Sequence, residues 1–381
     1  MNFDFSEEQQ QLRGALARLL DRGYEFDKRK QIVASDAGLS REIWKQLAEL
    51  GALSIALPEA HGGAGGNAVD TLVIMEALGR RLVVEPYLPT VVLGAGLVAR
   101  AGNDAQRTRL LPAVGGGQHL LALAHDERDS RYELAQVATR ARPDGAGFVL
   151  DGDKAVVLGG GAADTLIVSA RTAGEPGDPA GISLFLVDAG APGVSRRSYA
   201  TQDNQRAADV SLAGVRVGGD ALLGPAGDGA ALVEHAIQHG IAAVCAEALG
   251  VMAVLVELTS AYVKTRKQFG VAIGQFQVLQ HRLADMLMRV EQARSMAYLL
   301  ATTVDTGDPA QRRRITAAAK AMVSQAGHFV GHGAIQLHGG IGVTDEAPVS
   351  HYFKRITTIG MTFGDADHHV ARFSDLMERG A

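Results

Sequence analysis

The sequence contains a single cysteine, Cys245, among 381 residues. One cysteine cannot form an intrachain disulfide, and it cannot build a zinc or iron–sulfur site of the cysteine type. This economy fits a reducing compartment, and we expect a cytoplasmic location. The first ten residues, MNFDFSEEQQ, carry acidic side chains where a secretion signal carries positive charge, and no apolar segment follows them. Export is therefore not expected.

An excess of charge of one sign is also missing. The chain has 37 Lys and Arg against 42 Asp and Glu, a formal net charge of −5. No basic run is long enough to attract a phosphate backbone, so we expect no nucleic-acid partner. The most apolar stretch, about 241–259, contains Glu247 and Glu257 and lacks membrane-type flanks. It predicts a buried core helix and no membrane span.

Several common catalytic motifs are absent. There is no G-x-S-x-G elbow and no P-loop, which removes the most frequent hydrolase and nucleotidase signals. His235 with His239 and His328 with His332 stand at i, i+4, but neither pair forms the H-E-x-x-H pattern of a zinc protease. No third ligand is evident near either pair, and we predict no metal site.

Residues 1–118 have the periodicity of helices. Ser6 stands three residues before Gln9, the spacing of a capping box, and Ser40 is expected to cap a second helix. The glycine triplet 115–117 is the best candidate for a linker. We therefore predict an N-terminal all-α domain over these residues.

Residues 119–225 change to short β-rich runs separated by turn residues, which predicts an antiparallel barrel or sandwich. The dipeptide 151–152, Asp-Gly, lies between the runs 147–150 and 155–158 and could form a tight hairpin turn. The segment 172–180 is expected to be a surface loop. No helices long enough for parallel crossovers separate the runs.

Residues 226–381 are helical again. Helical patterns run from about 226 to 265, over 276–303 and 309–334, and after Asp365, which predicts a four-helix bundle. The expected fold class is thus α+β and multidomain, with a helical, a β and a second helical domain in this order.

Two stretches contain more than packing requires. In 262–277, YVKTRKQFGVAIGQFQ, a helix ends in basic residues and turns through two glycines. Cations are expected at a helix C-terminus for the macrodipole alone, so a capping role and an anion site remain open. Phe269, Phe276 and Gln277 in the same turn favour a flavin or adenine site.

The second stretch is 336–342, QLHGGIG, with three glycines in four residues. Glycine lets a ligand approach the backbone closely, and free backbone N–H groups can bind phosphate. A helix C-cap needs only one glycine, so binding is favoured. The stretch is not a GxGxxG after a strand, and it does not indicate a Rossmann domain.

Together these stretches resemble the acyl-CoA dehydrogenase family. YVKTRKQFGVAIGQFQVLQHRLADM, QLHGGIGVT and the three-part domain order match it over nearly the whole chain. More narrowly, KAVVLGGGAADTLIVSART, LFLVDAGAPGVSRRSYATQD, HYFKRIT and FGDADHH resemble the small subunit of pimeloyl-CoA dehydrogenase, which works with a large subunit. The resemblance implies FAD-dependent α,β-desaturation of an acyl-CoA or dicarboxylyl-CoA thioester. It also implies a middle antiparallel β-barrel between helical domains, a dimer of dimers, and electron-transfer flavoprotein as the electron acceptor.

The resemblance also implies cofactor contacts. Arg266 matches the arginine that reaches the FAD pyrophosphate across a subunit boundary, a task that suits its permanent charge and fork of donors. The other matched positions are Gln268, Phe269, Ile273, Gln277, Gln336, Leu337, Gly339 and Gly340. A site shared between chains implies that an isolated monomer binds FAD poorly.

The chain departs from the family where the catalytic base is expected. The usual glutamate falls on Met361 or Phe363, depending on the register, and no acid occurs from 356 to 364. The second known base position falls on Gly240. Asp365 is the nearest substitute, although an Asp at the start of a helix is more often a cap.

The middle domain departs as well. The family's Thr-Glu-Pro-x-x-Gly-Ser-Asp segment is replaced by residues 124–131, and the Trp-Ile-Thr at the flavin face by 156–158, where Leu158 offers no hydrogen-bond donor. Three main hypotheses follow: a dehydrogenase subunit with a catalytic partner, an autonomous dehydrogenase using Asp365, or a structural subunit without flavin. A flavin monooxygenase of the same fold is a fourth.

Overall fold

The structure is a computed structural model that describes residues 5–306 and 308–378. The chain packs as two compact units. The bundle unit comprises Met1–Lys30, Ala68–Val83 and Ile241–Ala381, and the sheet unit comprises Gln31–Asn67 and Val84–Gly240. The outer ends of the predicted terminal domains, at 1–4 and 379–381, lie outside the described residues. The three predicted domain boundaries stay predictions.

Residues 5–118 fold into helices and the turns between them, as the periodicity predicts. The elements are α1 (Glu7–Gly23), α2 (Phe26–Ala34), α3 (Arg41–Glu49), η1 (Glu59–His61), α4 (Ala68–Arg81), the π-helical η2 (Leu88–Ala95), α5 (Gly96–Ala101) and α6 (Asp104–Gly115). Both predicted caps are confirmed. Ser6 Oγ accepts a hydrogen bond from the Gln9 backbone N–H at 3.2 Å, and the Ser6 backbone N–H donates to Gln9 Oε1 at 3.0 Å. Ser40 Oγ accepts from the Ile43 N–H at 3.2 Å.

The strands of the sheet unit form one largely antiparallel sheet. They are β1 (Leu121–Ala124), β2 (Arg140–Asp144), β3 (Gly147–Leu158), β4 (Thr165–Arg171), β5 (Ile182–Asp188), β6 (Val194–Ala200), β7 (Arg206–Gly218) and, after η3 (Gly219–Ala221), β8 (Leu222–Leu223). The order is β6-β7-β3-β2-β4-β5-β8, and β1 pairs with β4. The β1–β4 ladder is parallel, as is the single β2–β4 pair, so the sheet is not wholly antiparallel.

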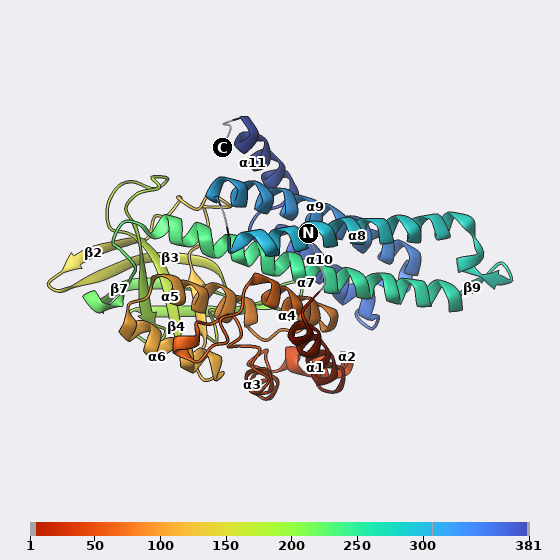
Figure 1. The fold of residues 1–381 in the computed structure, drawn as a ribbon, viewed down its shortest axis with the longest axis horizontal. Helices are drawn as coiled ribbons and strands as arrows, with labels where there is room; N and C mark the ends of the chain where they lie inside the picture. The colour runs from red at the N-terminus through yellow and green to blue at the C-terminus, as the bar shows by residue number, and fades with distance from the viewer. Residues whose placement is uncertain (1–4, 307, 379–381) are drawn as a thin grey trace. The chain divides into compact units, whose positions relative to one another are not determined.

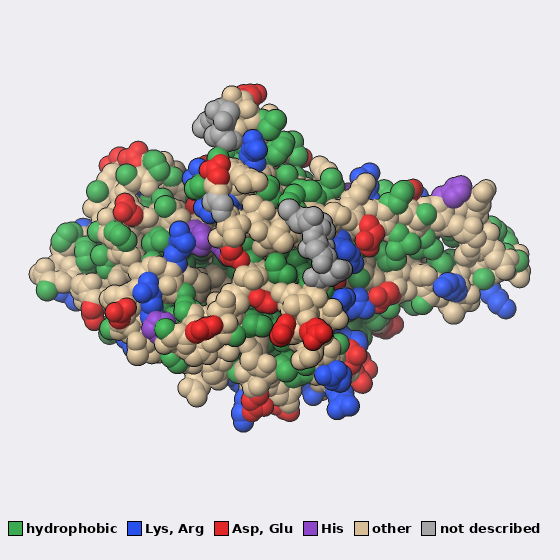
Figure 2. All heavy atoms as spheres, viewed as in Figure 1, with side chains coloured by type: hydrophobic (Ala, Val, Ile, Leu, Met, Phe, Trp, Pro, Cys, Tyr) green, Lys and Arg blue, Asp and Glu red, His purple; other side chains and the backbone are tan. Residues whose placement is uncertain are grey.

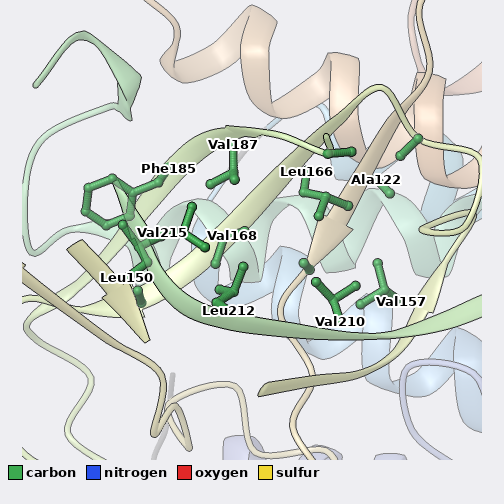
Figure 3. Packing of buried hydrophobic residues seen from close by; sticks show 14 of the residues in the cluster. Ala122, Leu150, Val157, Leu166, Val168, Phe185, Val187, Val210, Leu212 and Val215 are labelled. Atoms are coloured by element: carbon green, nitrogen blue, oxygen red, sulfur yellow. The ribbon is translucent and has the colours of Figure 1, made fainter. Parts of the chain in front are cut away.

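Apolar side chains from β1, β3, β4, β5 and β7 form the core of the sheet unit (Figure 3). Leu150, Leu166, Val168 and Phe185 have no exposed surface. Each buried side chain of this size contributes roughly 1.5–3 kcal/mol. The alternation of apolar residues along the strands therefore fixes which face of each strand points inward.

The hairpin turn expected at Asp151–Gly152 is wrong. β3 runs straight through both residues, and its register against β7 shifts between Leu150 and Gly152. From Leu150 to Gly152 the ladder takes two steps along β3 but three along β7, from Val215 to Leu212, so the extra residue of this bulge lies in β7, where Gly214 has φ +64°. Asp151 Oδ1 accepts from the Gly214 N–H at 2.7 Å instead of closing a turn. The chain reverses earlier, at Gly145 between β2 and β3.

The C-terminal part holds α7 (Gly229–Thr265), α8 (Gln277–Val304), α9 (Pro309–His338), α10 (Pro348–Met361) and α11 (Ala366–Glu378), with the short elements β9 (Lys267–Gln268), β10 (Val271–Ala272), η4 (Ile273–Gln275) and η5 (Gly339–Val343). The predicted long helices are confirmed, and α8 lies beside α9 (Figure 1). The sequence pattern did not reveal α10, so the described helices here number five instead of four. Its many β-branched residues have low helix propensity, and α10 gains stability by burying Tyr352, Ile356 and Ile359.

By length and composition, α7 is the one helix of the described residues that could cross a membrane. Its most apolar stretch is 78% buried, however, as in a core helix of a folded domain.

Candidate functional site: two turns at one end of the bundle and the loop after α10

The Arg266 turn is a small hairpin at the far end of the bundle (Figure 1). β9 and β10 pair antiparallel, and Phe269 and Gly270 between them have φ +52° and +82°, the left-handed values of a tight two-residue turn. The Arg266 carbonyl accepts from the Ile273 N–H at 2.9 Å and closes the base of the hairpin. The turn presents the Phe269 ring to solvent, with 91% of the residue exposed.

The Arg266 side chain has no partner among the described residues, because none forms a hydrogen bond or ion pair with its guanidinium. Figure 2 shows further Lys and Arg side chains at this end of the bundle. At the start of α8, Phe276 supplies no side-chain cap, so the first N–H groups of α8 are left for another acceptor. Both features favour an anion.

The Gln336 turn follows the end of α9. Gly339 has φ +66° and ψ −145°, a conformation that suits glycine. A Cβ at Gly339 or Gly340 would meet no heavy atom within 4 Å, so both backbones are open to a ligand. Gln336 is exposed, whereas Leu337 is only 6% exposed and packs into the bundle. Three of the four predicted residues in this turn therefore face outward.

The Arg266 turn and the Gln336 turn lie at the same end of one chain's bundle. Tyr262, one turn before the end of α7, stacks on His338 at the end of α9, with ring centroids 4.5 Å apart and planes at 26°. His338 Nδ1 lies 2.8 Å from the Ala334 carbonyl, which holds the ring in place. No second copy is needed to bring these two turns together. Ile273 and Gln277 lie on the same connection into α8.

The loop after α10 carries no acid before Asp365. Met361 is 51% exposed, and Phe363 adopts φ +60°, an uncommon value for a bulky residue. Asp365 Oδ1 accepts from the His368 N–H at 2.8 Å, the contact of a helix cap. Asp365 thus has a structural task at the start of α11.

Lys320 of α9, which sequence reasoning missed, reaches this loop. Its ammonium donates to the carbonyls of Ile359, Gly360 and Gly364 at 2.9, 3.1 and 2.9 Å and to Ser324 Oγ at 3.0 Å. The residue is fully buried, and burial lowers the pKa of Lys320 to about 8. The only signal in the sequence is a lysine whose neighbours on the same helix face, Thr316, Ala317, Val323 and Ser324, are buried and uncharged.

A buried ion pair anchors α10 within the bundle unit. Arg355 donates to both carboxylate oxygens of Glu247 on α7, from Nε at 2.6 Å and Nη2 at 2.5 Å. Both side chains are less than 10% exposed. The Tyr352 hydroxyl donates to the Arg80 carbonyl at 2.6 Å. Together these contacts fix α10 against α7 and α4.

In the sheet unit, the segment that replaces the family's flavin-contacting run is tied down by a second buried lysine. Lys154 Nζ donates to Glu127 Oε1 at 2.8 Å, to the His125 carbonyl at 3.1 Å and to Ser169 Oγ at 3.1 Å. Burial lowers the pKa of Lys154 to about 8 and that of His125 to about 3. This cluster is structural, since its charges satisfy one another.

The strand end that matches the family's flavin face is strained. Val156 has φ +54°, which is a genuine outlier for a β-branched residue, and it is 49% exposed. Asp209 of β7 braces it by accepting from the Val156 N–H at 3.4 Å and from the Tyr199 hydroxyl at 3.1 Å. Leu158 remains without a donor side chain, as the sequence indicated.

No set of three or more His, Cys, Asp and Glu side chains that could hold a metal occurs in the described part of the chain. The i, i+4 histidines lie against each other with tilted rings, whose centroids are 4.2 Å apart for His235 and His239 and 4.1 Å apart for His328 and His332.

Three family models match nearly the whole chain. The N-terminal domain of acyl-CoA dehydrogenase matches residues 6–118, its middle domain 122–214 and its C-terminal domain 227–373. The chain belongs to the acyl-CoA dehydrogenase family. It is therefore an oxidoreductase of the acyl-CoA dehydrogenase fold, and its cofactor is FAD.

Individual relatives agree with this assignment. Acyl-CoA dehydrogenase FadE27 of Mycobacterium tuberculosis is 30% identical over 98% of this chain and 97% of its own length. A variant of the Tcur3481–Tcur3483 steroid ACAD superposes with a TM-score of 0.88 at 33% identity, covering 98% of both chains. The ChsE4–ChsE5 complex from Mycobacterium tuberculosis gives 0.89 at 29% identity and 99% coverage of both.

The residues of the two turns fit FAD chemically. An unpartnered guanidinium, two open glycine backbones and the uncapped start of α8 suit a pyrophosphate, and an exposed aromatic ring with nearby amides suits an adenine. The strand end in the sheet unit lacks the donor that the family uses toward the flavin ring. The two turns thus keep more of the side chains that the family uses toward FAD than this strand end does.

Proposed function

We propose that this chain is one subunit of an FAD-dependent acyl-CoA dehydrogenase that works with a glutamate-bearing partner chain. One observation carries the proposal: the loop after α10 is formed and presents Met361, 51% exposed, but no acid stands between 356 and 364. Removal of the α-proton of a thioester needs a positioned base, and a thioether or a phenyl ring cannot serve.

FAD supplies the acceptor for the hydride that leaves the β-carbon. In this proposal Arg266 and the backbones of Gly339 and Gly340 hold the pyrophosphate, and Gln268, Phe269, Ile273, Gln277 and Gln336 surround the adenine and ribose. The partner's glutamate removes the α-proton. The flavin bound with help from this chain's turns would then be shared between chains, as in the family.

Two relatives support a two-chain assembly, because the ChsE4–ChsE5 complex and the Tcur3481–Tcur3483 steroid ACAD each pair two differently named proteins. We infer a dimer of dimers that contains both chains, with electron-transfer flavoprotein as the electron acceptor. The single cysteine, Cys245, favours a cytoplasmic location.

For the substrate we propose an acyl-CoA or dicarboxylyl-CoA thioester, with pimeloyl-CoA as the first choice because of the resemblance to that enzyme's small subunit. The steroid relative adds steroid-derived CoA thioesters to the compounds worth testing. A dicarboxylyl chain needs a cation at the far end of its pocket to pair with the terminal carboxylate.

Asp365 as the base of an autonomous dehydrogenase is the weaker alternative. Its carboxylate already accepts from the His368 N–H at 2.8 Å. The third possibility, a structural subunit without flavin, gives no physical reason for an open glycine turn beside an unpartnered arginine.

The proposal is tested by purifying the chain alone and together with family members that carry the glutamate. Visible spectra and turnover with a panel of CoA thioesters are recorded for each preparation. We expect a yellow complex and turnover only with the partner. Strong turnover of the chain alone that is lost in Asp365→Asn would establish the autonomous enzyme, and colourless preparations throughout would establish the structural subunit.

A further inference from the structure

We propose that Lys320 is a positioning residue that fixes the loop Met361–Phe363, where the family's base would stand, in one conformation. The role of this loop in catalysis rests on the proposed function, but the clamp, by which we mean the contacts of Lys320 with the two ends of the loop, does not. The loop is short and lies between the end of α10 and the start of α11.

The contacts of Lys320 lie on both sides of this loop. Ile359 and Gly360 precede it and Gly364 follows it, and all three carbonyls accept from the same ammonium within 3.1 Å. The last carbonyls of a helix have no intrahelical partner and carry partial negative charge. An ammonium has three N–H donors and no acceptor, and here the three carbonyls and Ser324 Oγ share them. One side chain therefore ties the two ends of the loop to one point.

The loop conformation needs such a clamp. Phe363 has φ +60° and Gly364 φ +110°, and a Cβ on Gly364 would lie 2.6 Å from His369 Nε2. His369 Nε2 is 2.9 Å from the Phe363 carbonyl, which adds a second tie from α11. Backbone in such sparsely populated regions persists only where its surroundings enforce it.

Three titratable side chains in the described part of the chain face the Lys320 ammonium, and two of them are uncharged at neutral pH. Cys245 approaches from α7, Asp365 from the loop end and His369 from α11. Burial raises the pKa of the Cys245 thiol to about 12 and lowers that of His369 to about 4, so both are neutral at neutral pH. Among residues 5–306 and 308–378, Asp365 is the carboxylate whose charge acts on the ammonium.

Lys154 of the sheet unit offers a matched control. It is also fully buried, and burial also lowers its pKa to about 8, but it pairs with a carboxylate, Glu127, and contacts no part of the α10–α11 loop. Replacing either lysine by methionine removes one buried ammonium from the protein. Only the replacement at 320 should free the loop.

The experiment measures hydrogen–deuterium exchange at neutral pH in the full chain, comparing wild type, Lys320→Met and Lys154→Met. In Lys320→Met we expect the amides of 360–366 to exchange at least about tenfold faster, the factor for losing one charge-assisted hydrogen bond, with α8 unchanged. Unchanged exchange in folded Lys320→Met, or equal acceleration by Lys154→Met, would overturn the proposal.

A second measurement uses a variant at the exposed Met361 together with Lys320→Met. The methyl ¹³C signal of Met361, assigned by its disappearance in Met361→Leu, is followed from about pH 6 to about pH 10. We expect a titration step near the Lys320 pKa of about 8. A titration step that persists unchanged in Lys320→Met would contradict the clamp. Neither readout involves FAD or substrate, so a colourless protein with a Lys320-dependent loop refutes the proposed function and leaves the clamp standing.

Discussion

Two regions of the bundle unit differ in the functional side chains that they present. One is formed by the turns at Arg266 and Gln336, and the other is the loop after α10. The turns at Arg266 and Gln336 present a guanidinium without a partner, open glycine backbones and an exposed aromatic ring. The loop after α10 is equally well ordered by its contacts but presents Met361 where an acid would act. In the proposed function, nucleotide binding and proton abstraction therefore depend on separate parts of the bundle unit.

The loop after α10 lacks the acidic side chain of the family but has a well-held backbone. The contacts that hold the backbone of the loop are present. Lys320 binds the carbonyls on both sides of the loop, and the Glu247–Arg355 pair anchors α10, which precedes it. Both clusters are costly to desolvate, so the hydrogen bonds around them must offset their burial.

The largest expected effect comes from giving the loop an acid. In a complex whose partner has its glutamate replaced by glutamine, Met361→Glu or Phe363→Glu should raise acyl-CoA turnover about 10²–10⁴-fold, the usual contribution of a general base. Met361→Gln and Phe363→Gln are the matched controls without a base. If neither variant gained activity, the loop could not place an acid for proton abstraction, and the contrast with the two turns would not rest on the missing side chain alone.

Next in size is the anchor of α10. Arg355→Met leaves Glu247 as a buried charge without its bidentate partner and should lower the free energy of unfolding by about 3–5 kcal/mol. Arg80→Met removes the exposed pair with Glu257, whose side chains are 38% and 58% exposed, and should cost at most about 1 kcal/mol. Urea unfolding of both variants measures this, and similar losses would show that α10 is not specially anchored.

The pH dependence of stability gives a third test. The pKa of Lys320 is about 8 in the folded chain and 10.5 for a free lysine. Between these values the unfolded chain holds a proton that the folded chain has released, so stability rises with pH by at most about 3 kcal/mol. Lys320→Met should lack this rise. Parallel curves for wild type and Lys320→Met from about pH 8 upward would contradict the burial of a charged lysine.

The smallest expected effect concerns the Arg266 turn. Arg266→Gln should weaken FAD binding roughly 10–100-fold, through loss of charge-assisted hydrogen bonds to a phosphate. Lys267→Gln, which removes the neighbouring cation, should change the dissociation constant much less. A fluorescence titration with FAD compares them. Equal losses would mean that the turn attracts the nucleotide only by its general positive charge.

Much of the fold follows from local signals in the sequence. The capping residues Ser6 and Ser40 fix helix starts through contacts three residues away, which a linear pattern records. The bulge opposite Gly152 could not be predicted, because Asp-Gly suits a hairpin turn equally well and only pairing with β7 decides. α10 was hidden because tertiary burial outweighs its low helix propensity.

The candidate site divides in the same way. The turns at Arg266 and Gln336 stand out through runs of glycine and basic residues, but their proximity depends on the Tyr262–His338 stack, which joins two helix ends far apart in sequence. The role of Lys320 could not be predicted from the sequence, because it binds backbone carbonyls, which every residue has.

The central claim is that this chain helps to bind FAD but does not abstract the proton. The most direct test adds a CoA thioester, without oxygen, to the complex of this chain with a partner whose glutamate is replaced by glutamine, and follows the visible flavin absorbance. The account predicts that the absorbance persists, and that it falls with the unmodified partner. Loss of absorbance with the glutamine partner would show that this chain supplies a base of its own.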